Sequence, residues 1–418
     1  MVYYGQLMQT SFFNDTFFVG NRRRLQAAVK SSAPIVVAAN GLLQRGGDSS
    51  FSFCQDANFW YLTGIDEPDL LLVMDGDEEY LIVPPRDASR TAFDGAVDDQ
   101  ALTSRSGIKT IYETEAGWSR LTERLKAGQQ AATIAAAPSY IERYGLYANP
   151  ARARLIKQLK AITSDLKLAD IALDIVRLRM IKQAPELAAL QAAIDITRAS
   201  LQAATKPAKM SKYGHEYQLE AEIAHGFRSR GATGHAFEPI VAGGQRACTL
   251  HNVANNSPLA ANELVVVDVG AEVEHYAADI TRTVCTGKPS PRARAVHAAV
   301  ADIQRYAFSL LKPGVFLADY EKQIESRTGE KLLELGVIEE NTHEAVRQYY
   351  PHAASHFLGL NVHDAGDYEL PLAPGMVITV EPGIYIPAEG IGVRIEDDVL
   401  ITKRGIKILS KKLRSSLE

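Results

Sequence analysis

Residues 265–284 read VVVDVGAEVEHYAADITRTV, and this stretch decides how the second half of the chain folds. It contains two apolar, strand-like runs, and each run holds one aspartate, Asp268 or Asp279. A hairpin that turns at Val273-Glu274 would place these aspartates directly opposite each other, with their Cβ atoms about 5 Å apart. Two ionised carboxylates that close repel each other in an apolar setting, so one pKa must rise unless a cation lies between them.

A second stretch, residues 380–400 (VEPGIYIPAEGIGVRIEDDVL), repeats this arrangement with glutamates. Glu381 and Glu396 lie on two further strand-like runs, and a turn at Ala388-Glu389, between a proline and a glycine, would bring them opposite each other. The acids of one such hairpin could simply face water. Two hairpins that each carry a facing acidic pair indicate instead that four carboxylates converge on divalent cations.

A third stretch, residues 355–364 (SHFLGLNVHD), adds two imidazoles. His356 and His363 would face opposite sides of one straight strand, but a bend at Gly359 would bring both to one cavity. An imidazole beside carboxylates shifts the preference from Mg²⁺ or Ca²⁺ toward Mn²⁺, Zn²⁺, Co²⁺ or Fe²⁺. Four carboxylates and one histidine exceed the needs of one tetrahedral zinc and suit two cations about 3.5 to 4 Å apart. The spacing leaves open which histidine is the ligand and which is a neighbouring hydrogen-bond donor.

Around these stretches, the pattern from residue 169 to residue 418 predicts an α+β domain. Apolar residues recur at helical spacing from Asp170 onward, with a break at Ala184-Pro185. Further helices are expected at residues 214–230, 291–312 and 317–336, and strands dominate the remainder after residue 235. We therefore expect helices packed on a largely antiparallel sheet.

Residues 1–168 predict a smaller α/β domain. Residues 34–42 are typical of a buried strand, and residues 70–83 of a hairpin that turns at an Asp-Gly-Asp sequence. Helical patterns follow at residues 118–127, 139–146 and 151–161. This alternation favours an α/β arrangement, with the domain boundary near residue 168.

Composition excludes several classes of function. The chain has 418 residues and a net charge of −5, which gives no electrostatic reason to expect nucleic acid or an anionic membrane as a partner. Three cysteines without a CxxC pair argue against a disulfide framework or a cysteine-based zinc site. The N-terminus lacks the basic lead and apolar core of a signal peptide, and no apolar run reaches the length of a membrane span, so we expect a cytoplasmic protein.

Several of these segments resemble one known family. DVGAEVEHYAADITRT, SHFLGLNVHD, VEPGIYI and GVRIEDDV resemble the metal-site motifs of the pita-bread metallopeptidases. Near the N-terminus, FCQDANFWYLTGIDEPD (residues 53–69) resembles the aminopeptidase P, or Xaa-Pro aminopeptidase, branch of that family. The resemblance implies a C-terminal pita-bread domain preceded by the smaller N-terminal domain.

The resemblance also implies a role for each candidate residue. It gives five metal ligands, two of them (Asp279 and Glu396) bridging both ions: Asp268, Asp279, His356, Glu381 and Glu396. It gives four residues that support catalysis beside the metals: His251, His363, Glu381 and Arg394. It gives four residues that contact substrate, two of them (His352 and Tyr385) near a proline pocket: His352, His363, Tyr385 and Arg394. Asn252 and Asn361 depart from the family pattern, in which Tyr and Asp are common at these positions.

The activity implied by the resemblance is hydrolysis of the N-terminal Xaa-Pro bond of peptides, with two divalent ions as cofactors, manganese first and zinc or cobalt as alternatives. A homodimer or homotetramer is implied as well. Two alternatives stay open: an Xaa-Pro dipeptidase with the same metal site, and a catalytically inactive binding protein of the same fold.

Overall fold

The structure is a computed structural model that describes residues 11–85, 95, 98–134, 141, 144–413, 415 and 417. The chain divides into two compact units, residues 1–178 (unit 1) and residues 179–418 (unit 2). Within the described ranges, no helix combines the length and the apolar character that a membrane span requires.

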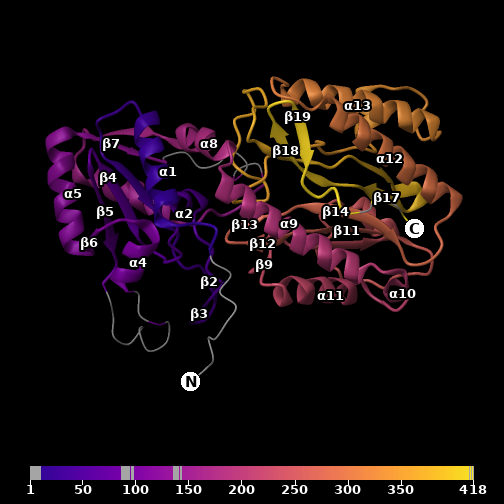
Figure 1. Cartoon of the computed structure of the whole chain (residues 1–418), viewed down its shortest axis with the longest axis horizontal. Coiled ribbons are helices and arrows are strands. Elements are labelled where there is room, and N and C mark those ends of the chain that lie inside the picture. The colour runs from indigo at the N-terminus through magenta and orange to yellow at the C-terminus, as the bar shows by residue number, and fades with distance from the viewer. Residues whose placement is uncertain are drawn as a thin grey trace. The chain divides into compact units, whose positions relative to one another are not determined.

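Unit 1 is built on a mixed six-stranded sheet with the strand order β6-β5-β4-β1-β7-β8 (Figure 1). Its elements are α1 (Asp15–Ala28), β1 (Ile35–Ala38), β2 (Gln44–Gly46), β3 (Ser49–Ser50), α2 (Ala57–Thr63), β4 (Leu71–Asp75), β5 (Glu78–Val83), α4 (Asp99–Ser106), β6 (Thr110–Glu113), α5 (Thr114–Gly128), β7 (Gln130–Thr133), α7 (Ala151–Ile162) and β8 (Lys167–Asp170). Helix α8 (Ala172–Met180) spans the boundary between the units. The predicted α/β alternation and the hairpin within residues 70–83 are confirmed. Half of the helix predicted at 139–146 lies outside the described residues, and residues 144–146 form a turn and irregular chain instead of a helix.

The aromatic stretch of unit 1 forms α2 for a local reason. The Asp56 side chain caps the helix by accepting the backbone N–H groups of Asn58 and Phe59. Gly64, with φ of 68°, ends it in the left-handed conformation. Residues 59–63, including Trp60, are buried, so this part of the helix belongs to the core of unit 1.

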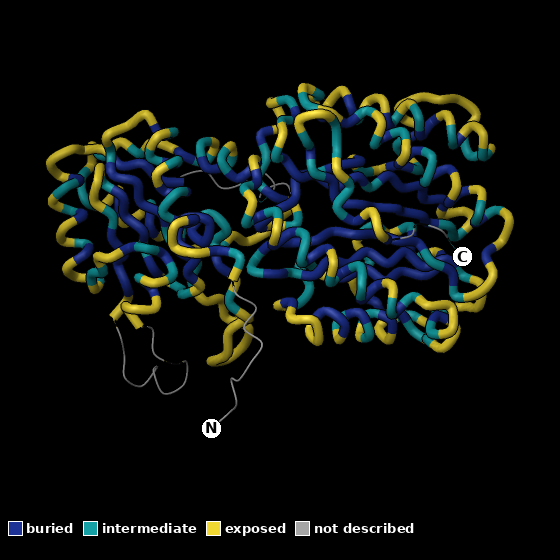
Figure 2. The backbone as a smooth tube through the Cα atoms, viewed as in Figure 1, coloured by how far each residue is buried: buried dark blue, intermediate teal, exposed yellow. Residues whose placement is uncertain are grey.

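In unit 2, helices surround a set of antiparallel β-strands. Its elements are α9 (Ala184–Ala204), α10 (Pro207–Met210), α11 (Glu216–Ser229), β9 (Gly234–His235), β10 (Ile240–Gly243), η1 (Gly244–Cys248), β11 (Leu264–Val269), β12 (Ala271–Val273), β13 (Tyr276–Ala277), β14 (Ile280–Cys285), α12 (Pro291–Leu310), α13 (Leu317–Glu334), α14 (His343–Arg347), β15 (Val377–Val380), β16 (Gly383–Ile386), η2 (Pro387–Glu389), β17 (Ile391–Arg394), β18 (Asp397–Thr402) and β19 (Gly405–Ile408). Within this unit, α9 and α11 lie on one side of the strands, and α12 and α13 lie on the other (Figure 1). Figure 2 shows the strands as the most deeply buried part of the unit. The described ladders of unit 2 are antiparallel, which confirms the predicted α+β arrangement.

The first acidic hairpin has a different register from the predicted one. Asp268 pairs with Thr281 rather than with Asp279, and the chain turns at Glu274-His275, one residue later than expected. Glu274 and His275 both have positive φ, 45° and 68°. This conformation matches the twist of a two-residue hairpin turn but is usually adopted by Asn or Gly, so Glu274-His275 is not recognisable as a turn from residue type. Asp268 and Asp279 are therefore diagonal neighbours on one face of the hairpin instead of a direct pair.

The second acidic hairpin has the predicted register. β16 and β17 pair Gly383 with Arg394, and β15 and β18 pair Val380 with Asp397. Both ladders follow one continuous register, in which Glu381 and Glu396 are the opposing residues. The tip is formed by η2 and by Gly390, whose φ is 62°, so the expected turn is confirmed.

Candidate metal centre

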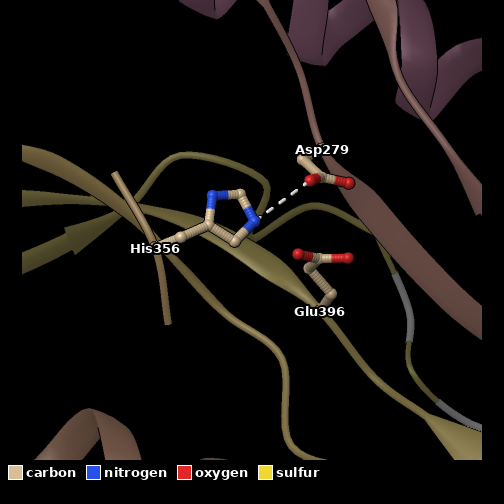
Figure 3. Close-up of side chains that lie close together, drawn as sticks. All are labelled: Asp279, His356 and Glu396. Carbon is tan, nitrogen blue, oxygen red and sulfur yellow. Dashed lines mark ion pairs between the residues drawn. The ribbon is translucent and has the colours of Figure 1, made fainter. Parts of the chain in front are cut away.

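Three side chains that are distant in sequence meet in unit 2. One ligand atom from each of Asp279, His356 and Glu396 lies within 4.8 Å of the others (Figure 3). The Nε2 atom of His356 lies 3.4 Å from Asp279 Oδ2. Asp279 directly precedes β14 and Glu396 directly precedes β18, so a strand end fixes each acid.

Two further acids complete what we call the carboxylate cluster. Glu381 Oε1 lies 3.4 Å from His356 Nε2. Asp268, at the end of β11, is close enough to Asp279 for its charge to raise the pKa of Asp279. The structure thus brings together the five predicted ligands: Asp268, Asp279, His356, Glu381 and Glu396.

Gly270 makes the approach of Asp279 possible. It lies opposite Asp279 in the hairpin register, and a Cβ atom at this position would come within 1.7 Å of the carbonyl oxygen of Ala278. No side chain fits there without a backbone shift. Glycine is therefore required for the close strand crossing that presents Asp279 to the cluster.

The two histidines of SHFLGLNVHD lie side by side, as the predicted bend at Gly359 requires. Their ring centroids are 4.3 Å apart. A Cβ atom at Gly359 would lie 2.2 Å from Asp364 Oδ2, so the bend packs directly onto a buried carboxylate. His356 faces the acids of the cluster, and His363 is more exposed at its edge.

The cluster has the chemistry of a cation site. Among the described residues, no hydrogen-bond donor reaches three of its buried carboxylate oxygens: Asp268 Oδ1, Asp279 Oδ1 and Glu396 Oε1. A buried anionic oxygen without a partner costs several kcal/mol unless a proton or a cation compensates it. Hard carboxylate oxygens with one imidazole fit divalent ions such as Mn²⁺, Co²⁺ or Zn²⁺.

The pKa values show the same strain between charges. Burial, together with the charges of Asp268, Asp398 and Glu381, holds the pKa of Asp279 well above its ordinary value. Burial likewise raises the pKa of Glu381 to about 7, although His356 and Arg394 oppose the shift. Carboxyl groups this close together would repel one another strongly if all were ionised. Their spacing is stable when protons or bound cations neutralise part of the charge.

A chain of hydrogen bonds leads away from Asp268. Arg394 donates from one guanidinium nitrogen to Asp268 Oδ2 at 2.7 Å and from the other to the Tyr385 hydroxyl at 2.9 Å. The Tyr385 oxygen lies 2.8 Å from His352 Nε2. Burial and the charge of Arg394 lower the pKa of His352 to about 3, so this imidazole is neutral. Three of the four residues predicted to contact substrate, Arg394, Tyr385 and His352, thus form one connected edge of the site.

His251 and His363 lie next to the cluster. Partial desolvation and the nearby imidazoles of His356 and His251 lower the pKa of His363. A neutral imidazole such as that of His363 can donate a hydrogen bond to a bound molecule.

Sequence reasoning missed several residues that hold the cluster. The Thr281 hydroxyl donates to Glu396 Oε2 at 2.7 Å and accepts from Arg394 Nε at 3.2 Å. Asp398 Oδ2 accepts the backbone N–H of Asp279 at 3.2 Å. Both residues lie in quoted motifs, but other polar side chains share their strands, so residue type alone did not single them out.

Comparison with known proteins identifies the family. A family model described as metallopeptidase family M24 matches residues 188–403, and one described as the aminopeptidase P N-terminal domain matches residues 18–134. Xaa-Pro aminopeptidase 3 of Homo sapiens is 35% identical over 417 residues, which cover 93% of this chain and 80% of the relative. The chain belongs to metallopeptidase family M24, in its aminopeptidase P branch.

Other M24 proteins agree with this assignment. The structure of aminopeptidase PepP from Pseudomonas aeruginosa superposes with a TM-score of 0.86 at 27% identity and covers 97% of this chain and 96% of its own. A zinc-substituted Escherichia coli aminopeptidase P in complex with product has a TM-score of 0.82 at 28% identity, with 96% of each chain covered. The Xaa-Pro dipeptidase of Pyrococcus furiosus is 36% identical, but over only 60% of this chain and 68% of the relative. The M24 assignment confirms the predicted pita-bread metallopeptidase fold, and it implies divalent metal ions.

Proposed function

We propose that this M24 enzyme hydrolyses the N-terminal Xaa-Pro bond of peptides and releases the residue before proline. The observation that carries the proposal is that four carboxylates and His356 converge, and that three of the buried carboxylate oxygens accept no hydrogen bond within the part of the chain that the structure describes. The substrate class is supported by the human relative, whose name states this activity and whose similarity spans both units. An inactive binding protein is disfavoured because all five proposed ligand residues are present.

We propose that Asp268, Asp279, His356, Glu381 and Glu396 hold two divalent ions, with Mn²⁺ first and Zn²⁺ or Co²⁺ as alternatives. When bound, such ions supply Lewis acidity, which makes water a stronger acid and the scissile carbonyl more electrophilic. Arg394 and Thr281 orient the carboxylates through the hydrogen bonds described above. The expected homodimer or homotetramer and the cytoplasmic location stay predictions.

The residues around the cluster provide the remaining functions. We assign to Glu381 the acceptance of the proton of the attacking water and its delivery to the leaving proline nitrogen. We assign to His251 and His363 hydrogen bonds to the oxyanion that develops on the scissile carbonyl, an interaction worth about 3 kcal/mol in comparable sites. We propose that a pyrrolidine ring packs against His352 and Tyr385, which lie in hydrogen-bond contact with each other.

The test compares two glutamates of the same hairpin in a peptide assay. Glu396 lies in the cluster, whereas Glu389 lies at the exposed tip and pairs with Arg292. With Mn²⁺ present, wild type and Glu389→Gln should cleave an Xaa-Pro-Xaa tripeptide, and Glu396→Gln should lose at least about 100-fold in kcat. A folded Glu396→Gln variant with normal turnover would refute the site.

An Xaa-Pro dipeptidase is the second candidate function. The similarity to the Pyrococcus furiosus dipeptidase supports it, although that similarity spans a smaller part of the chain. Turnover of an Xaa-Pro dipeptide and of an Xaa-Pro-Xaa tripeptide with the same first residue separates the two. Cleavage of the dipeptide alone would favour the dipeptidase.

A further inference from the structure

The second hairpin opens at the two glutamates that the proposed function uses as ligands. The β15–β18 ladder ends before Glu381, and the β16–β17 ladder begins after it. On the opposite strand, Glu396 lies in the same gap. Because buried carbonyl groups need partners, an opening of this kind must be filled from outside the hairpin.

Gln304, on helix α12, supplies donors to both sides of the opening. Its Nε2 atom lies 3.3 Å from the carbonyl oxygen of Val380 and 3.2 Å from that of Ile395. Val380 directly precedes Glu381, and Ile395 directly precedes Glu396. One side-chain amide therefore bonds to the peptide groups that lead into both glutamates.

The same amide is anchored in a larger buried network. Gln304 Nε2 also lies 2.9 Å from Asp397 Oδ2, so its two hydrogens are shared among three acceptors. Asp397 Oδ1 accepts from Arg282 at 2.7 Å and from the Ser410 hydroxyl at 2.5 Å. Arg282 donates in addition to the carbonyl oxygen of Glu396 at 2.6 Å. The four residues of this network are at most 5% exposed, so water competes little for these hydrogen bonds.

We propose that Gln304 is a positioning residue that sets the spacing of Glu381 and Glu396 across the opened hairpin. The inference rests on the proposed function, because it treats both glutamates as ligands. Gln304 touches neither carboxylate, and it acts through the backbone that carries them. Groups that orient metal ligands in this indirect way typically change cation affinity or activity by about 10- to 100-fold when removed.

The principal test is Gln304→Met, which keeps the length of the side chain and removes the donors. The matched control is Thr328→Val, because Thr328 is equally buried in the same unit but donates only to Ile324 O of its own helix, at 2.8 Å. Binding of Mn²⁺ to the full chain is measured by titration calorimetry, and kcat and KM are measured with an Xaa-Pro-Xaa tripeptide. We expect Gln304→Met to lose about 10-fold or more in Mn²⁺ affinity or kcat with a KM within about threefold of wild type, and Thr328→Val to change neither.

The outcomes distinguish this inference from the proposed function. If wild type binds no Mn²⁺, the metal centre is refuted and the role of Gln304 with it. If wild type binds Mn²⁺ and Gln304→Met binds and turns over equally well, the role of Gln304 alone is refuted. If Gln304→Met does not fold, Gln304→Asn replaces it, since a side chain shorter by one methylene cannot bridge both carbonyls, and wild-type affinity and turnover in that variant overturn the inference.

Discussion

Replacing Asp364 with asparagine should destabilise unit 2 far more than replacing a surface carboxylate. Asp364 Oδ1 accepts from Arg179, and Asp364 Oδ2 accepts from Lys182 Nζ at 2.9 Å. All three side chains are at most 3% exposed. Asparagine has nearly the same shape but no charge, so Asp364→Asn removes the carboxylate that pairs with both buried cations.

The expected size of the effect follows from this burial. Removing one partner of a buried ion pair costs about 3–5 kcal/mol. For a unit of this size, each kcal/mol lowers the melting temperature by about 2–4 °C. The transition of unit 2 should therefore fall by roughly 6–20 °C.

The pH dependence gives the prediction a sign. Burial acts to raise the pKa of Asp364, but Arg179 and Lys182 outweigh it and hold the pKa below its ordinary value. A carboxyl group whose pKa is depressed in the folded state adds its full contribution to stability at pH values above its unfolded pKa of about 3.9. That contribution to stability is lost as the pH falls through the folded-state pKa. The difference in melting temperature between wild type and Asp364→Asn should be constant around neutral pH and should become smaller below about pH 4.

Thermal unfolding of the full chain, followed by calorimetry, measures the effect. Glu389→Gln is the control, because it breaks an exposed ion pair that is worth at most about 1 kcal/mol. In the double variant Lys182→Met/Asp364→Asn, one excess cation is removed, so part of the loss should be recovered. A melting temperature of Asp364→Asn within about 2 °C of wild type at pH 7 would show that the buried charges do not stabilise the unit.

Three further outcomes are expected. Gly270→Ala should abolish Mn²⁺ binding and lower the free energy of unfolding by at least about 2 kcal/mol, because the new Cβ would collide with the carbonyl of Ala278. Gly20→Ala, which has open space around its Cβ, should have neither effect. Calorimetry measures Mn²⁺ binding, and urea denaturation measures the free energy of unfolding. His297 is 7% exposed, and burial followed by the charge of Arg282 lowers its pKa to about 4, so wild type should lose stability as the pH falls from about 6.5 to 4. Over that pH interval, the free energy of unfolding of His297→Gln should fall by about 3 kcal/mol less than that of wild type. An equal fall in both proteins, measured by urea denaturation at each pH, would contradict this assignment. Removing metal with a chelator should lower the melting temperature, because the buried carboxylates then repel, and added Mn²⁺ should restore it; an unchanged melting temperature would speak against a resident cation.

The two acidic hairpins show how far the sequence predicts this fold. For Glu381 and Glu396, a proline and a glycine mark the turn, and the predicted register agrees with the structure. For Asp268 and Asp279, the turn is made by Glu274-His275, residues that rarely adopt positive φ, and the predicted register was wrong. Alternation of apolar and polar residues predicts strands, but turn conformation decides which residues face each other.

The residues that brace the site were the hardest to predict. The carboxylates and His356 were proposed from residue type and motif, and the structure brings them together. Gln304 and Thr281 carry no such signal, because a glutamine on a helix or a threonine on a strand is ordinary. Their importance depends on contacts with residues about a hundred positions away, which one sequence does not reveal.

The continuous register of the second hairpin has a consequence for chain length in natural and engineered relatives. Both strands alternate their faces with a period of two, so adding one residue within β16 or β17 would reverse the face of every following side chain of that strand. Segments inserted at the tip between Ile386 and Ile391, such as an epitope tag or a reporter, should instead form a closed loop that leaves both flanking strands unchanged. Variants with a single residue inserted within either strand should therefore lose function.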